Sequence, residues 1–229
     1  MKATVASPGQ GIAPSARGTV VPLWLKLAYT AFVAVLVPVY LRNYGPTNFL
    51  YFCDTALFLT LVSVWTENAL PVSMAAVGIL IPQFLWCVDF GAELLGFHLT
   101  GMTSYMFDTN RSLLLRGLSL IHGWLPFLLV YLVLRLGYDR RALMAWTALA
   151  WILCLIAFFL LPPAGAQLAD PKLPLNVNLV FGFNDAQPQN WMPPGRYLVV
   201  WMLALFGLAY VPTHLMLKHF LIRVAPIDP

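Results

Sequence analysis

The sequence predicts an all-α polytopic membrane protein with about six transmembrane helices in one bundle. Two observations lead to this prediction: 60% of the 229 residues are hydrophobic, and only 10% are charged. Soluble domains carry about a quarter charged residues, so this chain has too few polar side chains to face water on all sides. A helix that crosses a bilayer needs about 20 mostly apolar residues, and six stretches of this kind are present.

The six predicted spans are separated by short turns and by two longer connectors. The spans cover residues 20–42, 48–66, 69–90, 113–137, 142–162 and 197–221. The connector 91–112 is less apolar and is expected to lie along the membrane interface. The connector 162–195 is rich in proline, which has no backbone N–H to donate, so a loop is predicted there.

Basic residues near the span ends indicate the orientation. Eight of the 13 Lys and Arg residues fall on the side that holds both termini, and five fall on the other side. The positive-inside rule then places both termini in the cytoplasm, and we expect the membrane to be that of a bacterial cell. The predicted organisation is a disordered cytoplasmic tail at 1–19, the transmembrane domain at 20–222 and a short cytoplasmic tail at 223–229.

The net charge of +4 does not indicate a nucleic-acid-binding protein, because the basic residues are scattered at the ends of apolar segments. Membrane lipids are the expected partners. Cys53, Cys87 and Cys154 all fall in apolar segments, and an odd count without CxxC spacing argues against a disulfide framework. No cofactor is indicated. A zinc site built from Cys53, Asp54 and His122 is a weak alternative, since no HExxH pattern supports it.

The stretch 48–61, NFLYFCDTALFLTL, places Asp54 beside Cys53 inside an apolar span. An ionised side chain at the bilayer centre costs about 2.5–3.5 kcal/mol, so such a residue indicates a functional site. With six spans, Cys53, Asp54, Asp89 and His122 all fall in the half of the membrane that faces the 162–195 loop. The alternative is structural: Asp54 pairs with Arg116 or His122 to hold the helices in register.

The fourth span carries a stripe of polar and small residues at three- and four-residue spacing: Arg116, Ser119, His122, Gly123 and Pro126. Pro126 cannot donate a hydrogen bond to the carbonyl of His122. A kink is therefore expected beside the histidine, with a free carbonyl acceptor there.

Three short segments resemble motifs of the YwaF-type bacterial integral membrane family. The segment 48–54, NFLYFCD, resembles its L-P-L-H-L-C motif, and 119–124, SLIHGW, is similar to its S-H-G segment. The segment 176–181, NVNLVF, resembles its G-x-N-Y-M-F stretch. The order and spacing of the three agree, and together they cover about 45–222.

That family is similar to a eukaryotic transmembrane acyltransferase that uses a cysteine and a histidine, which the resemblance places on Cys53 and His122. It is more remotely similar to the androgen-induced hydrolases of fatty acid esters of hydroxy fatty acids. The threonine of those hydrolases aligns with Tyr51, where the bacterial motif has histidine, so this chain departs from both patterns.

The predicted chemistry is lipid acyl transfer or lipid-ester hydrolysis. His122 would accept the Cys53 thiol proton, Asp54 would orient the imidazole, and the thiolate would attack an ester carbonyl to give a thioester. Substrate-binding or oxyanion-stabilising roles are expected for Tyr51, Arg116, Ser119, Asn176 and Asn178.

The competing hypothesis is a non-enzymatic membrane scaffold, lipid-binding protein or partner subunit with a structural polar network. The distance between the Cys53 sulfur and the His122 ring distinguishes the two hypotheses. A small-solute transporter ranks below both, because the two halves of the chain show no inverted repeat.

Overall fold

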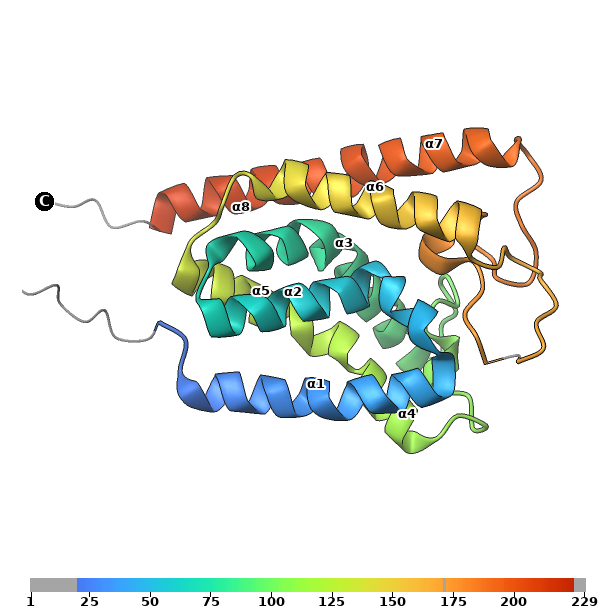
Figure 1. The fold of residues 1–229 in the computed structure, drawn as a ribbon, viewed down its shortest axis with the longest axis horizontal. Coiled ribbons are helices and arrows are strands. Elements are labelled where there is room, and N and C mark those ends of the chain that lie inside the picture. The colour runs from blue at the N-terminus through green and yellow to red at the C-terminus, as the bar shows by residue number, and fades with distance from the viewer. Residues whose placement is uncertain (1–19, 171, 225–229) are drawn as a thin grey trace, which may run out of the picture.

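The computed structural model describes residues 20–170 and 172–224, and every regular element within them is helical (Figure 1). The prediction of an all-α polytopic membrane protein with about six spans is confirmed. The predicted tail 1–19 lies outside the described residues, as does 225–229. The helices are α1 (Leu23–Tyr44), η1 (Pro46–Leu50), α2 (Phe52–Thr66), α3 (Ala69–Leu94), η2 (Ser104–Met106), α4 (Leu113–Ser119), α5 (Ile121–Leu136), α6 (Ala142–Leu160), η3 (Val177–Leu179), α7 (Pro194–Ala204), η4 (Leu205–Tyr210) and α8 (Val211–Val224).

Five stretches of the described chain are long and apolar enough to cross a membrane: α1, α3, α4 with α5, α6, and the run from α7 to α8. The predicted second span is shorter than expected, because η1 takes up its first residues and leaves 15 residues for α2. α1 begins and α8 ends at one end of the bundle, which we call the tail end (Figure 1). Segment 161–193 lies at the opposite end, which we call the loop end.

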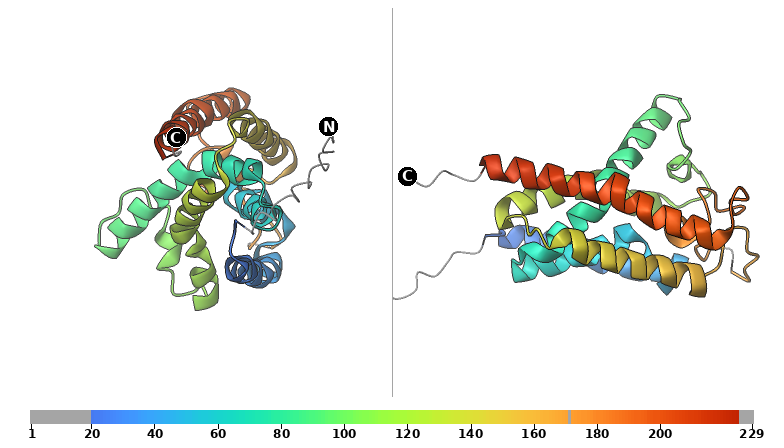
Figure 2. Two further views of the ribbon diagram at one scale, coloured as in Figure 1. Left: turned by 90° about the vertical axis from the view of Figure 1, so that its left-hand side faces the viewer. Right: turned by 90° about the horizontal axis from the view of Figure 1, so that it is seen from above.

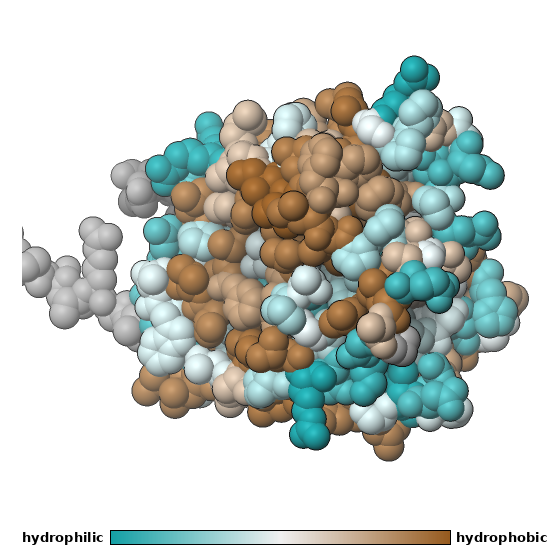
Figure 3. All heavy atoms as spheres, turned by 45° about the vertical axis from the view of Figure 1, so that its right-hand side comes forward, coloured by the Kyte–Doolittle hydropathy of each residue, from teal (hydrophilic) through white to brown (hydrophobic). Residues whose placement is uncertain are grey.

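Side chains on the surface are arranged as a membrane-embedded bundle requires. Figure 3 shows apolar side chains over the middle of one face and hydrophilic side chains mainly towards the loop end. The exposed residues include large apolar groups on all the long helices, among them Trp24, Phe84, Phe127, Phe159 and Leu208. Because acyl chains are as apolar as these side chains, their exposure is expected for a chain that lies in lipid.

α3 is the central helix and packs against α2, α5 and α6, whereas α1 and the run from α7 to α8 are less buried. A close approach occurs at Gly78 of α3, which receives the fully buried indole of Trp146 from α6. A Cβ atom on residue 78 would lie 1.9 Å from Trp146 Cε2. Small residues allow membrane helices to approach closely, and Gly78 is the position that permits this contact.

The fourth crossing is broken between α4 and α5, where the sequence predicts a kink. Leu120 separates the two helices, and the Gly123 amide donates to the Leu120 carbonyl at 2.9 Å. Pro126 leaves the carbonyl of His122 without its helical donor. The Cys87 thiol of α3 donates to that carbonyl at 3.7 Å, so the free acceptor predicted from the sequence is occupied from a neighbouring helix.

The second half of α3 leans away from the other helices, and the connector 95–112 forms the tip of this projection (Figure 2). α3 contains Pro82 and ends at Leu94, four residues later than the sequence predicts. The connector then returns to α4 through η2.

Candidate functional site

Cys53 and Asp54 lie in the first turn of α2, at the loop end of the bundle. The Asp54 side chain is buried, and its Oδ2 accepts a hydrogen bond from Asn48 Nδ2 at 2.9 Å. Asn48 is itself buried and belongs to η1, which turns the chain from α1 into α2. The carboxyl group is therefore held by a neighbour six residues earlier in the chain.

Tyr40 joins α1 to α4 through Ser119. Ser119 has one hydroxyl proton, which it donates to the Leu115 carbonyl at 3.0 Å, so the Tyr40 hydroxyl is the donor in its 3.4 Å contact with Ser119 Oγ. We call Tyr40, Asn48, Cys53, Asp54 and Ser119 the loop-end cluster.

Asn178 closes this cluster from the long loop. The side chain of Tyr51, the N-cap residue of α2, makes no capping hydrogen bond, and Asn178 Oδ1 instead accepts from the Phe52 amide at 3.0 Å. Asn178 Nδ2 donates to the Leu50 carbonyl at 2.9 Å, and the Asn178 carbonyl accepts from Trp201 Nε1 at 2.9 Å. A helix start needs acceptors for its first N–H groups, and here one comes from a residue 126 positions away.

Asn176 organises the loop itself. Its Nδ2 donates to the Gly182 carbonyl at 2.8 Å and to Asp185 Oδ1 at 3.3 Å, while its Oδ1 accepts from the Phe181 amide at 2.8 Å. Burial raises the pKa of Asp185, and the hydrogen bond from Asn176 partly offsets that rise. Asn176, Asn178 and Leu179 all have positive φ values between 48° and 60°. Such backbone costs of order 1–3 kcal/mol per residue, and the surrounding hydrogen bonds hold it in place.

His122 faces α3. Its Nδ1 lies 2.9 Å from Gln83 Nε2 and 3.1 Å from Gln83 Oε1, so the imidazole tautomer decides which amide atom is the partner. The Trp86 ring lies against the imidazole with the ring centroids 5.3 Å apart. With the contact between the Cys87 thiol and the His122 carbonyl, three α3 side chains surround this histidine.

Tyr51 and Arg116 make their contacts with backbone carbonyls. The Tyr51 hydroxyl donates to Leu175 of the long loop at 3.4 Å. Arg116 donates from Nη1 to Met106 of η2 at 3.2 Å, and its buried Nε has no hydrogen-bond partner among the described residues. Arg116 therefore turns towards the connector and not towards Asp54.

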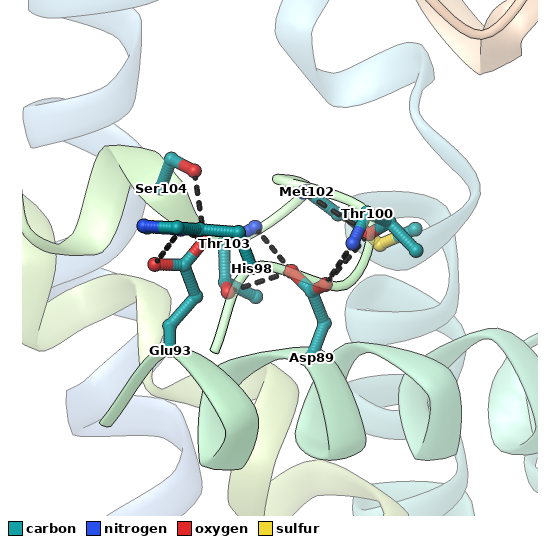
Figure 4. A network of polar contacts seen from close by, with 7 residues as sticks. All are labelled: Asp89, Glu93, His98, Thr100, Met102, Thr103 and Ser104. Atoms are coloured by element: carbon teal, nitrogen blue, oxygen red, sulfur yellow. Dashed lines mark hydrogen bonds and ion pairs between the residues drawn. The ribbon is translucent and has the colours of Figure 1, made fainter. Parts of the chain in front are cut away.

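Asp89 holds the tip of the projection, as Figure 4 shows. Oδ1 accepts from the amide and the hydroxyl of Thr100, both at 2.8 Å, and Oδ2 accepts from the amide and the hydroxyl of Thr103 at 2.9 and 2.7 Å. One turn later, Glu93 accepts from Ser104 at 3.1 Å and pairs with His98, which raises the pKa of His98 through a hydrogen bond. These contacts fix a connector that has little regular structure.

The predicted site residues thus fall into two groups. Cys53, Asp54, Tyr51, Ser119 and Asn178 lie around the start of α2, whereas His122 lies on α5 with its imidazole against α3. In the chain between residues 20 and 224, leaving out residue 171, no hydrogen bond or ion pair joins Cys53 or Asp54 to His122 or Arg116. Over the same residues, no group of three His, Cys, Asp or Glu side chains is placed to hold a metal ion.

Tyr40, Asn48 and Gln83 are the contacting residues that sequence reasoning missed. A contact of Gln83 could have been predicted from the sequence, because an amide side chain inside an apolar span needs a hydrogen-bond partner. Tyr40 and Asn48 carry no such signal, since tyrosine and asparagine are ordinary residues at the end of a span.

No protein-family model, curated protein or solved structure matches the chain. The resemblance to the YwaF-type family therefore stays a prediction.

Proposed function

We propose that the chain is a lipid-binding membrane scaffold whose polar residues at the loop end lock the bundle and whose outer surface binds membrane lipid. The supporting observation is that the polar side chains of the expected site form hydrogen bonds between segments that are distant in sequence. Gln83 and His122 join α3 to α5, Tyr40 and Ser119 join α1 to α4, and Asn178 joins the long loop to α2.

The pairing of His122 with Gln83 favours this function over catalysis. A general base for Cys53 must come within hydrogen-bond reach of the thiol. The Nδ1 atom of His122 is engaged by Gln83, and the imidazole lies beside Trp86. Both contacts hold the imidazole ring of His122 against α3.

A double-mutant cycle tests whether the contact between Gln83 and His122 stabilises the bundle. Gln83→Ala, His122→Ala and the double variant should lower thermal stability in lipid nanodiscs non-additively, with a coupling near the ~0.6 kcal/mol average for hydrogen bonds between membrane helices. Native mass spectrometry of the wild-type protein should show phospholipid that survives detergent washing. Additive losses, or a wild-type protein free of lipid, would contradict the scaffold.

Lipid acyl transfer or lipid-ester hydrolysis is the second candidate, favoured by the burial of Asp54 beside Cys53 under the Asn178 cap. The thiol would attack an ester carbonyl and release the alcohol, leaving an acyl thioester for water or a second headgroup. The thiol proton would pass to Asp54 or, after the imidazole leaves Gln83, to His122.

A maleimide probe with a lipid tail tests this second candidate. Cys53→Ala should abolish labelling that competes with lipid ester, whereas Cys154→Ala, a buried change on α6, should leave that labelling intact. Equal labelling of both variants would remove Cys53 from any mechanism.

The apolar helices indicate that the protein is embedded in a membrane. We further propose that this membrane is that of a bacterial cell and that both termini lie in the cytoplasm. A protease site placed after residue 2 should be cut in spheroplasts only after the membrane is opened. Cutting of intact spheroplasts would reverse the orientation.

A further inference from the structure

An apolar groove of about 280 Å³ runs between α1 and α5, in the part of α1 nearer the tail end. It is lined by Leu25, Ala28, Tyr29, Phe32, Trp124 and Leu128. The two helices run in opposite directions, and both belong to stretches that can cross a membrane. The groove therefore lies where acyl chains surround the protein.

Aromatic side chains form the floor of the groove. The rings of Tyr29 and Phe32 meet the Trp124 indole nearly edge-on, with centroid distances of 6.1 and 5.0 Å. The Tyr29 hydroxyl donates to the Leu57 carbonyl at 2.9 Å, which satisfies this polar group within the protein. Such a floor suits a hydrocarbon chain, because hydrocarbon needs no hydrogen-bond partner.

Arg135 lies beyond the tail end of the groove. It lies seven residues after Leu128, which is two turns along the same face of α5. Its Nη2 donates to the carbonyl of Val20, just before α1, at 3.1 Å, so the guanidinium bridges the two helices. Lys26, which is also near this mouth, is already paired with Glu67 at 2.7 Å.

We propose that this groove is a seat for one phospholipid, with an acyl chain between α1 and α5 and the phosphate on Arg135. A guanidinium has five N–H donors in a fork that matches phosphate, and among residues 20–170 and 172–224 Arg135 uses one of them, on the Val20 carbonyl. The groove volume of about 280 Å³ is enough for a run of methylene groups. The seat rests on the proposed lipid-binding function and gives that function a place and a ligand class.

The test uses the full-length chain in nanodiscs of phosphatidylglycerol and phosphatidylethanolamine, followed by detergent release and native mass spectrometry. Ala28→Phe should fill the groove and remove the most tightly held phospholipid. Ala34→Phe is the matched control, because Ala34 is also exposed on α1 but lies about half a turn away from the groove.

Arg135→Gln should weaken phospholipid retention about tenfold, as expected for one charge-assisted contact. Arg140→Gln, an exposed change at the same end, should leave retention unchanged. If Ala28→Phe and Arg135→Gln retain as much phospholipid as the wild-type protein, the proposed site between α1 and α5 is wrong, but the proposed lipid-binding function is not contradicted. If the wild-type protein keeps none, both proposals are wrong.

Discussion

The contact between α3 and α6 and the polar contacts at the loop end both lie inside the bundle, but they depend on different physical properties. At Gly78 and Trp146 the helices pack by shape complementarity, because the indole of Trp146 fills the space that a side chain on residue 78 would occupy. At the loop end, Asp54, Asn178 and Ser119 are held by hydrogen bonds. Lipid supplies no hydrophobic force that draws helices together, so close packing and hydrogen bonding are two of the main means.

The two regions should therefore respond to different changes. A contact made by shape is sensitive to added volume, because a closely packed interior relaxes only partly. A polar contact is sensitive to the loss of one partner, because the remaining group is left unsatisfied in a medium without water.

The largest effect is expected from Gly78→Ala. The new methyl group would overlap the Trp146 ring, which is fully buried, so we expect a loss of about 3 kcal/mol. Thermal unfolding in detergent measures the loss. Gly91→Ala, in the same helix but with open space around the added Cβ, should be neutral or slightly stabilising. Equal effects of the two changes would show that the shape of this contact is unimportant.

Asp89→Asn should have an intermediate effect. An asparagine keeps one acceptor oxygen and places an NH₂ group against donors of Thr100 or Thr103, so at least one donor loses its partner, at a cost of about 1–3 kcal/mol. Limited proteolysis within 95–112 should become faster. Asp108→Asn serves as the control, since Asp108 is more exposed and its carboxylate bonds locally to Asn110. Protease resistance equal to wild type would mean that Asp89 does not hold the connector.

The smallest effect is a pH dependence at the tail end. Glu67 accepts from Lys26 and from the amides of Val20 and Val21, and the Lys26 hydrogen bond is the main cause that lowers the pKa of Glu67 from its ordinary value of 4.5. A lowered folded-state pKa means that this contribution is present above pH 4.5 and is lost as the pH falls through the folded-state value.

Melting temperatures between pH 7 and pH 3 should thus fall more steeply for the wild-type protein than for Glu67→Gln. Asp170→Asn, an exposed loop change, should retain the wild-type profile. Parallel curves for the wild type and Glu67→Gln would show that this carboxylate does not tie α1 to the turn between α2 and α3.

Much of the architecture could be predicted, whereas the partners of the site residues could not. The spans are visible because a bilayer requires continuous apolar helices, and the break beside His122 is visible because Pro126 lacks an N–H. The position of Cys53 and Asp54 at the loop end also follows from counting spans. The pairing of Asp54 with Asn48 depends on η1, a short turn that apolar periodicity does not reveal.

The amino-acid sequence by itself determined that this protein is an all-helical bundle with several apolar helices long enough to cross a membrane, since hydropathy and segment length fix both properties. Only the tertiary structure decided that His122 turns to Gln83 and that Asn178 caps α2. Depth along a helix is set by residue number, but rotation about the helix axis is set by packing. Here contacts such as Trp146 against Gly78 fix that rotation.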